Sequence, residues 1–129
     1  MMTRVLHVED EPDIQEVAKM ALEAVGGLTV EQAGSGKEAL AKAAAFAPDV
    51  ILLDVMMPGM DGPSTLAELR RSPATASIPV IFMTAKVQNQ EVERYKQLGA
   101  LDVIAKPFDP MTLSDSIREI WNRARPQIA

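Results

Sequence analysis

The chain has 129 residues, 47% of them hydrophobic, and carries a net charge of −5. This length and composition predict one folded domain rather than a disordered chain, and the acidic balance argues against nucleic acid or an anionic membrane as the main partner. The lack of cysteine excludes disulfides, thiolate catalysis and cysteine-based metal sites.

Short apolar runs alternate with segments of helical periodicity along the whole chain. The first run, RVLHV at residues 4–8, predicts a strand, and apolar residues at helical spacing follow over 12–25. Further strands are predicted at residues 28–33, 50–54, 79–84 and 102–105, with helices at 37–46, 64–71 and 88–98, the last of these ended by Gly99. Asp109 as N-cap and Pro110 as first helical residue predict the start of a final helix.

Strands that alternate with helices predict a parallel sheet covered by helices on both faces. No linker, repeat or low-complexity segment interrupts the pattern, so we expect one α/β domain over residues 1–129, with a core of about 3–123. No apolar run approaches the roughly 20 residues that span a bilayer. Acidic residues begin at Glu9, so we expect a soluble, cytoplasmic protein without a signal peptide.

The predicted strands end in residues that carry charge. Glu9 and Asp10 follow the first strand, and Asp54 ends the third. In open α/β sheets, functional sites lie beyond the carboxyl ends of the strands, so these three acids meet there if the two strands are neighbours. Two carboxylates about 4 Å apart repel by roughly 4 kcal/mol at an effective dielectric near 20. The cluster therefore either takes up protons or binds a cation, and an all-oxygen site suits Mg²⁺ or Mn²⁺.

Two further strands add groups that suit a phosphoryl oxygen. Thr84, at the end of the fourth strand, supplies a hydroxyl, and Lys106, after the fifth, supplies an ammonium group. A carboxylate nucleophile, a divalent metal, a lysine and a threonine together make a phosphoryl-transfer site. This interpretation makes Asp54 the phosphoryl acceptor.

Each of these residues also has a simpler explanation. A single Asp at a strand end is usually a turn former or a helix cap, and the acids before Pro12 can cap the first helix and favour its dipole. Four such coincidences at four strand ends are improbable. His7 lies inside a strand pattern, which indicates packing or hydrogen bonding rather than phosphoryl transfer. The stretch GSGKE at residues 34–38 lacks the first Gly and the Ser/Thr of a phosphate loop.

With these residues in view, the chain resembles the receiver domain of two-component response regulators. The resemblance covers about residues 3–123 and rests on HVEDEPDI, DVMMPGMDG, MTA and KPF in the family's order and spacing. It implies a flavodoxin-like, doubly wound five-stranded sheet of order 2-1-3-4-5. It also implies a role for each site residue: phospho-acceptor (Asp54), Mg²⁺ ligands (Glu9, Asp10, Asp54 and the Met56 backbone carbonyl), switch hydroxyl (Thr84) and phosphoryl-pairing lysine (Lys106). The resemblance further implies a cis Lys106–Pro107 bond.

The resemblance also indicates partners. A histidine kinase or a histidine phosphotransfer protein would supply the phosphoryl group, and the output would pass through the face made by the fourth helix, fifth strand and fifth helix to an unknown protein. We expect a stand-alone receiver without an output domain, which signals by protein contacts or relays the phosphoryl group. Glu9 stands where Asp is commoner, and Val103 stands where many receivers carry Tyr or Phe, so the usual aromatic switch is not expected.

Three other functions are alternatives to that of a receiver. A phosphatase-class hydrolase requires a second Asp two residues after its nucleophile, and this chain has Met56 at that position. A flavin-binding flavodoxin requires a phosphate-binding loop and more aromatic residues than this chain has. A phosphorylation-independent interaction module with a receiver fold is the main alternative, and the intact acid, threonine and lysine set counts against it.

Overall fold

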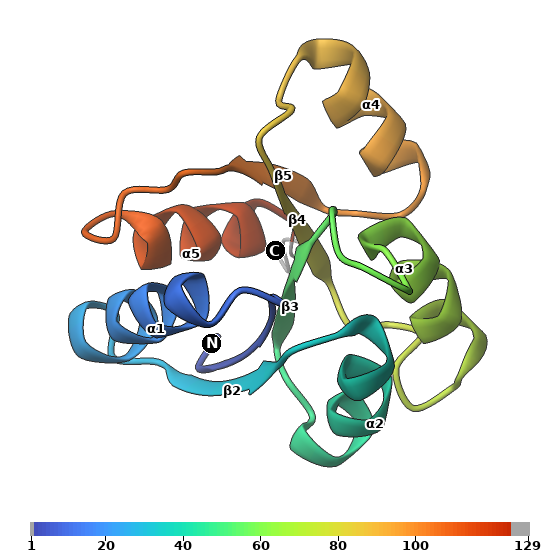
Figure 1. Ribbon diagram of the computed structural model, residues 1–129, viewed down its shortest axis with the longest axis horizontal. Coiled ribbons are helices and arrows are strands. Elements are labelled where there is room, and N and C mark those ends of the chain that lie inside the picture. Colours follow the sequence, from blue (N-terminus) through green and yellow to red (C-terminus); the bar gives the residue numbers. More distant parts are fainter. Residues whose placement is uncertain (1, 125–129) are drawn as a thin grey trace, which may run out of the picture.

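The computed structural model describes residues 2–124 and contains one five-stranded parallel sheet of order β2-β1-β3-β4-β5 (Figure 1). The strands are β1 (Arg4–Val8), β2 (Thr29–Ala33), β3 (Val50–Asp54), β4 (Val80–Thr84) and β5 (Asp102–Ala105). The helices are α1 (Pro12–Met20), the π-helical turn η1 (Ala21–Val25), α2 (Gly36–Phe46), α3 (Gly62–Arg71), α4 (Asn89–Gln97) and α5 (Leu113–Ala124). The predicted α/β fold and strand order are confirmed.

Two apolar clusters hold the helices to opposite faces of the sheet. Helices α2, α3 and α4 cover one face, and α1, η1 and α5 cover the other (Figure 1). Leu6 and Leu53 belong to the cluster on the first face, and Val5 and Leu52 belong to the cluster on the second. Because successive side chains of a strand face opposite sides, a strand covered on both faces must be apolar at every position. Strands β3 and β4 are buried along their whole length, which explains their uninterrupted apolar runs.

The final helix begins later than the sequence predicts. Asp109 makes the bonds of an N-cap, since its carboxylate accepts the amide of Met111 at 2.9 Å and its carbonyl accepts the amides of Thr112 and Leu113. These bonds form a separate turn over residues 110–112, and α5 starts at Leu113. The predicted helix start at Pro110 is therefore wrong, because the turn that Asp109 caps does not continue directly into α5.

Two other predicted features are confirmed. Gly99 follows the end of α4 with a φ of 114°, a conformation that glycine adopts without strain. The Lys106–Pro107 bond is cis. Within residues 2–124, no helix combines the length and the apolar character needed to cross a membrane.

Candidate functional site

The carboxyl ends of the four strands that carry the predicted site residues lie at the same edge of the sheet. The pairing of β1 with β3 sets Val8 beside Leu53, so the residues that follow them, Glu9 and Asp54, come next to each other. On the other side of β3, Asp54 pairs with Met83, which places Thr84 of β4 one residue further along. Parallel pairing therefore brings together residues that are distant in the sequence.

Three carboxylates form a compact cluster at this edge. Glu9, Asp10 and Asp54 each offer one carboxylate oxygen, and these oxygens lie within 4.8 Å of one another. Oxygens on opposite sides of an octahedral Mg²⁺ lie about 4.2 Å apart, since each bond is about 2.1 Å long. Glu9 is fully buried, Asp54 is 3% exposed, and Asp10 is half-buried at the solvent side. The donor set and its spacing fit a hard divalent cation with one side open to water.

Lys106 reaches into the cluster from the loop after β5. Its Nζ atom lies 2.9 Å from Glu9 Oε1 and 3.3 Å from Asp54 Oδ1. Burial opposes the charged form of Lys106, yet its contacts with the two carboxylates outweigh burial and raise the pKa of the ammonium group. Lys106 is therefore a fixed positive charge at neutral pH.

One lysine does not balance three acids. Burial raises the pKa of Glu9 to about 7, and repulsion from Asp54 acts in the same direction, although Lys106 and the Glu11 amide both favour the charged form. The Glu11 amide donates to Glu9 Oε2 at 3.2 Å. The cluster is thus short of positive charge, which a divalent cation or a proton can supply.

Thr84 is held at the rim of the same site. Its side chain is 3% exposed, and its Oγ1 atom accepts the Lys86 amide at 3.2 Å. Its carbonyl accepts the Lys106 amide at 3.0 Å, so β4 directly supports the lysine loop. The Thr84 hydroxyl hydrogen stays available for another acceptor.

Sequence reasoning missed two supporting residues. Gly62, at the start of α3, lies so close to β3 that a Cβ atom there would sit 2.7 Å from the Asp54 carbonyl oxygen. Gln15 of α1 donates its amide to the Glu9 carbonyl at 2.5 Å. The glycine before Pro63 could have indicated a close approach of two backbone segments, since such approaches require glycine. The sequence around Gln15 gives no indication that its side chain contacts the Glu9 carbonyl.

His7 has the structural role that the strand pattern indicates. It is fully buried in β1, and its Nδ1 atom lies 3.2 Å from the side-chain nitrogen of Gln32 on the neighbouring strand β2. Burial, together with the nearby positive charge of Lys106, lowers the pKa of His7 to about 4. His7 is therefore neutral at physiological pH.

Comparison with known protein families matches residues 5–118 to the response regulator receiver domain. The chain belongs to this family. Receivers are signalling modules rather than conventional enzymes and accept phosphoryl groups from histidine kinases, and Glu9, Asp10 and Asp54 form the acidic triad typical of their Mg²⁺ site.

Relatives of known name are similar over nearly the whole receiver. The chain is 37% identical over 122 residues to the DNA-binding dual master transcriptional regulator RpaA of Synechocystis, covering 95% of this chain and 50% of the relative. It is 37% identical over 126 residues to the phosphate regulon regulator PhoB of Escherichia coli, covering 98% and 55%. The chain thus spans about half the length of these relatives.

Solved structures show the same fold. The chemotaxis response regulator CheY4 of Vibrio cholerae superposes with a TM-score of 0.84 at 32% identity, covering 93% of this chain and 99% of that one. A response regulator from Chloroflexus aurantiacus gives a TM-score of 0.83 at 31% identity, covering 95% and 100%.

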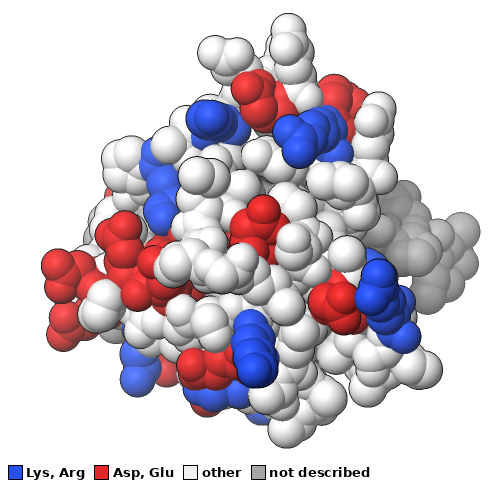
Figure 2. Space-filling model, turned by 45° about the vertical axis from the view of Figure 1, so that its right-hand side comes forward, with Lys and Arg blue, Asp and Glu red and all other residues white. Residues whose placement is uncertain are grey.

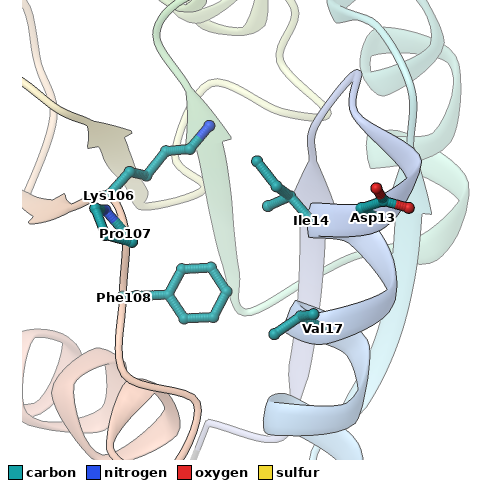
Figure 3. A pocket seen from close by; sticks show the side chains of 6 residues that line it. All are labelled: Asp13, Ile14, Val17, Lys106, Pro107 and Phe108. Atoms are coloured by element: carbon teal, nitrogen blue, oxygen red, sulfur yellow. The ribbon is translucent and has the colours of Figure 1, made fainter.

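An apolar pocket of about 240 Å³ lies between α1 and the loop after β5 (Figure 3). Ile14 and Val17 of α1 form one wall, and Phe108 faces them from the loop after β5 (Figure 3). Lys106 belongs to both sites, because it lines this pocket while its ammonium group contacts Glu9 and Asp54. Any molecule that fills the pocket therefore lies next to the acidic cluster.

Proposed function

We propose that this receiver accepts a phosphoryl group on Asp54 from the phosphohistidine of a histidine kinase or a histidine phosphotransfer protein. The observation that carries the proposal is the position of the Asp54 carboxylate, 3.3 Å from the Lys106 ammonium and inside a three-carboxylate cluster. Glu9, Asp10, Asp54 and the Met56 backbone carbonyl would hold Mg²⁺, or Mn²⁺ in its place.

The transfer needs little covalent chemistry from the protein. A carboxylate oxygen of Asp54 attacks phosphorus, the phosphorus–nitrogen bond breaks, and the imidazole leaves with the bonding electron pair, which gives an acyl phosphate. The bound cation would neutralise charge on the phosphoryl oxygens. Lys106 is already placed to pair with one such oxygen, and the Thr84 hydroxyl can donate to another.

Phosphorylation would then change the β4–α4 loop. The product places about two negative charges beside Thr84 and Lys106. In the structure Thr84 Oγ1 accepts the Lys86 amide, so rotation of Thr84 toward a phosphoryl oxygen would break a bond that ties the loop to β4. We propose that the resulting shift reaches the α4–β5–α5 face and alters its affinity for a partner protein, with a coupling of about 1–3 kcal/mol.

The surface charge is in keeping with a protein partner. On the face shown in Figure 2, Lys and Arg side chains are scattered among Asp and Glu side chains and do not gather into one basic surface. Nucleic-acid binding draws on clustered positive charge, and the chain as a whole carries a net charge of −5. The regulators RpaA and PhoB are named for transcription, but the match covers about half of each.

Phosphate labelling tests the proposal. Acetyl phosphate with Mg²⁺ should add one phosphoryl group, which hydroxylamine cleaves because it is an acyl phosphate, and intact-protein mass spectrometry measures both steps. Asp54→Asn should abolish the label, whereas Asp61→Asn should keep it, because Asp61 is the exposed N-cap of α3. A label that persists in Asp54→Asn would move the acceptor to another residue.

A further inference from the structure

Helix α4 buries a single side chain against the rest of the domain. Tyr95 is 6% exposed and is the single residue of α4 that is buried. By contrast, α5 buries four residues and α3 another four. In Figure 1, α4 lies at one edge of the molecule, and its main packing partner is β5. Lys96 of α4 also pairs with Asp102 of β5 at 3.9 Å, so the buried and ion-paired contacts of α4 with the sheet lie near its C-terminal end.

The attachment is an aromatic pair between α4 and β4. The rings of Tyr95 and Phe82 meet edge to face, with centroids 5.1 Å apart and an interplanar angle of 81°. Phe82 is fully buried and lies two residues before Thr84 on the same strand. Val103 of β5 packs against the same apolar cluster as this pair. Tyr95 therefore rests on the strand that carries Thr84.

The two ends of α4 are held differently. At its start, Gln88 provides no side-chain cap, and residues 85–90 are all exposed. At its end, the Ala100 amide donates to the Tyr95 carbonyl at 3.1 Å, and Ala100 itself is buried. The first turn of α4 is thus free to follow the β4–α4 loop, while the region from Tyr95 onward is fixed to the core.

We propose that Tyr95 is the positioning residue that makes α4 respond to the phosphorylation site. This inference rests on the proposed function. When Thr84 turns toward a phosphoryl oxygen and releases the Lys86 amide, the loop and first turn of α4 move, and α4 pivots on the contact between Tyr95 and Phe82. Without the Tyr95 ring, α4 keeps only its backbone bond to Ala100 and the Lys96–Asp102 pair at its C-terminal end, and movement of the loop is not converted into a defined rotation.

The test uses the full chain with Mg²⁺ and beryllofluoride, which stands in for the phosphoryl group, and follows backbone amides by NMR. In the wild type and in Tyr95→Phe, which keeps the ring, we expect amide shift changes across Asn89–Gln97. In Tyr95→Leu we expect these changes to fall at least threefold, while the changes at Thr84 and Lys106 persist. Leu28→Ala, a buried substitution near the start of β2, serves as the control for lost stability and should leave the α4 response unchanged.

A second measurement does not depend on a variant that folds. Tyr95 is the only tyrosine in the chain, so its ring protons are assigned directly, and in the wild type their contacts with the Phe82 ring should persist with beryllofluoride while the α4 amides shift. An unchanged α4 response in Tyr95→Leu, or loss of the ring contacts with Phe82 when beryllofluoride is added, would overturn the role of Tyr95. If neither Thr84 nor Lys106 shifts in the wild type, the proposed function itself fails.

Discussion

His7 of β1 and Glu9, which directly follows β1, lie two residues apart and make stability depend on pH in opposite directions. Glu9 has its pKa raised from 4.5 to about 7, so between these values the folded state holds more protons, and stability falls as pH rises. His7 has its pKa lowered from 6.5 to about 4, so here the unfolded state holds more protons, and stability falls as pH drops. Between about pH 4.5 and 6.5 the two effects oppose each other.

Removing His7 should expose the effect of Glu9 alone. When the pH is lowered from 7 to 4.5, the unfolding free energy of His7→Leu should decrease by about 2–3 kcal/mol less than that of the wild type. The reason is that the unfolded wild type takes up a proton on His7 over about two pH units in which the folded state does not, and the variant lacks this group. Urea unfolding in EDTA, followed by the fluorescence of Trp121, measures this difference. Glu9→Gln is the matched opposite, because it should lose stability more steeply than the wild type as the pH drops. Parallel pH profiles for all three proteins would contradict the assignment.

Met56 bears on the lifetime of the acyl phosphate. Its side chain is 73% exposed two residues after Asp54 and has no group that can orient water. Hydrolysis should therefore be slow, and Met56→Asn should accelerate it by about fivefold, because one positioned hydrogen bond is worth about 1 kcal/mol. The decay of label after removal of acetyl phosphate gives the rate. Met20→Asn, equally polar and on the exposed side of α1, should not change it, and a wild-type lifetime of seconds would contradict the prediction.

At the scale of elements, apolar patterning predicts most of the fold. All five strands appear within one residue of their predicted bounds, because strands covered on both faces must be apolar throughout. Local chemistry is less decisive where one residue type serves two structures. Asp109 suits both a helix cap and a turn, and residues 21–25 keep helical periodicity although they form a π-helical turn. Which of the two structures forms in each case depends on how α5 packs against η1, and the local sequence does not determine that packing.

The candidate site is predictable for a related reason. Once the strand order is known, the residues after each strand fall at one edge of the sheet, and Glu9, Asp54 and Thr84 need no further information. The carboxylate that Lys106 contacts cannot be predicted in this way, because the lysine side chain is long and two carboxylates compete for it. The raised pKa of Glu9 likewise comes from burial by the surrounding elements, not from its sequence neighbours.

The element pair formed by α1 and the loop after β5 predicts how a donor protein binds. The apolar pocket between Val17 and Phe108 adjoins Lys106, whose ammonium lies 3.3 Å from Asp54, so we expect a donor that fills the pocket to bring its phosphohistidine to Asp54. Val17→Lys should slow transfer from a cognate phosphohistidine protein by tenfold or more, since burying an unpaired ammonium at an interface costs more than about 1.4 kcal/mol. Single-turnover transfer of labelled phosphate measures the rate.

Two controls separate docking from chemistry. Acetyl phosphate needs no protein docking, so it should label Val17→Lys as fast as the wild type. Val25→Lys carries the same new charge at a similar exposure, 44% against 43% for Val17, but lies beyond the end of α1. It should keep the wild-type transfer rate. Equal slowing in both variants would show that net charge, rather than the pocket, governs the encounter.

Four of the five strands contribute residues to the acidic cluster and its surroundings. The three acids come from the ends of β1 and β3, Lys106 follows β5, and Thr84 joins the lysine loop to β4. Repulsion among the acids therefore acts against the packing of the central strands themselves. Any ligand that relieves this repulsion and binds only the folded state must raise the free energy of global unfolding.

Mg²⁺ should accordingly stabilise the fold as a whole. At a hundredfold excess over its dissociation constant, a ligand specific to the folded state adds about 2.7 kcal/mol. Thermal unfolding across a Mg²⁺ titration measures the gain as a rise in Tm. Asp10→Asn should lose the rise because a ligand is gone, yet without Mg²⁺ it should be at least as stable as the wild type, because one repelling charge has been removed. Asp13→Asn removes an exposed acid from the first turn of α1 and should keep the full rise. A Tm that does not change with Mg²⁺ in the wild type, or a rise that survives in Asp10→Asn, would place the cation elsewhere than in this cluster.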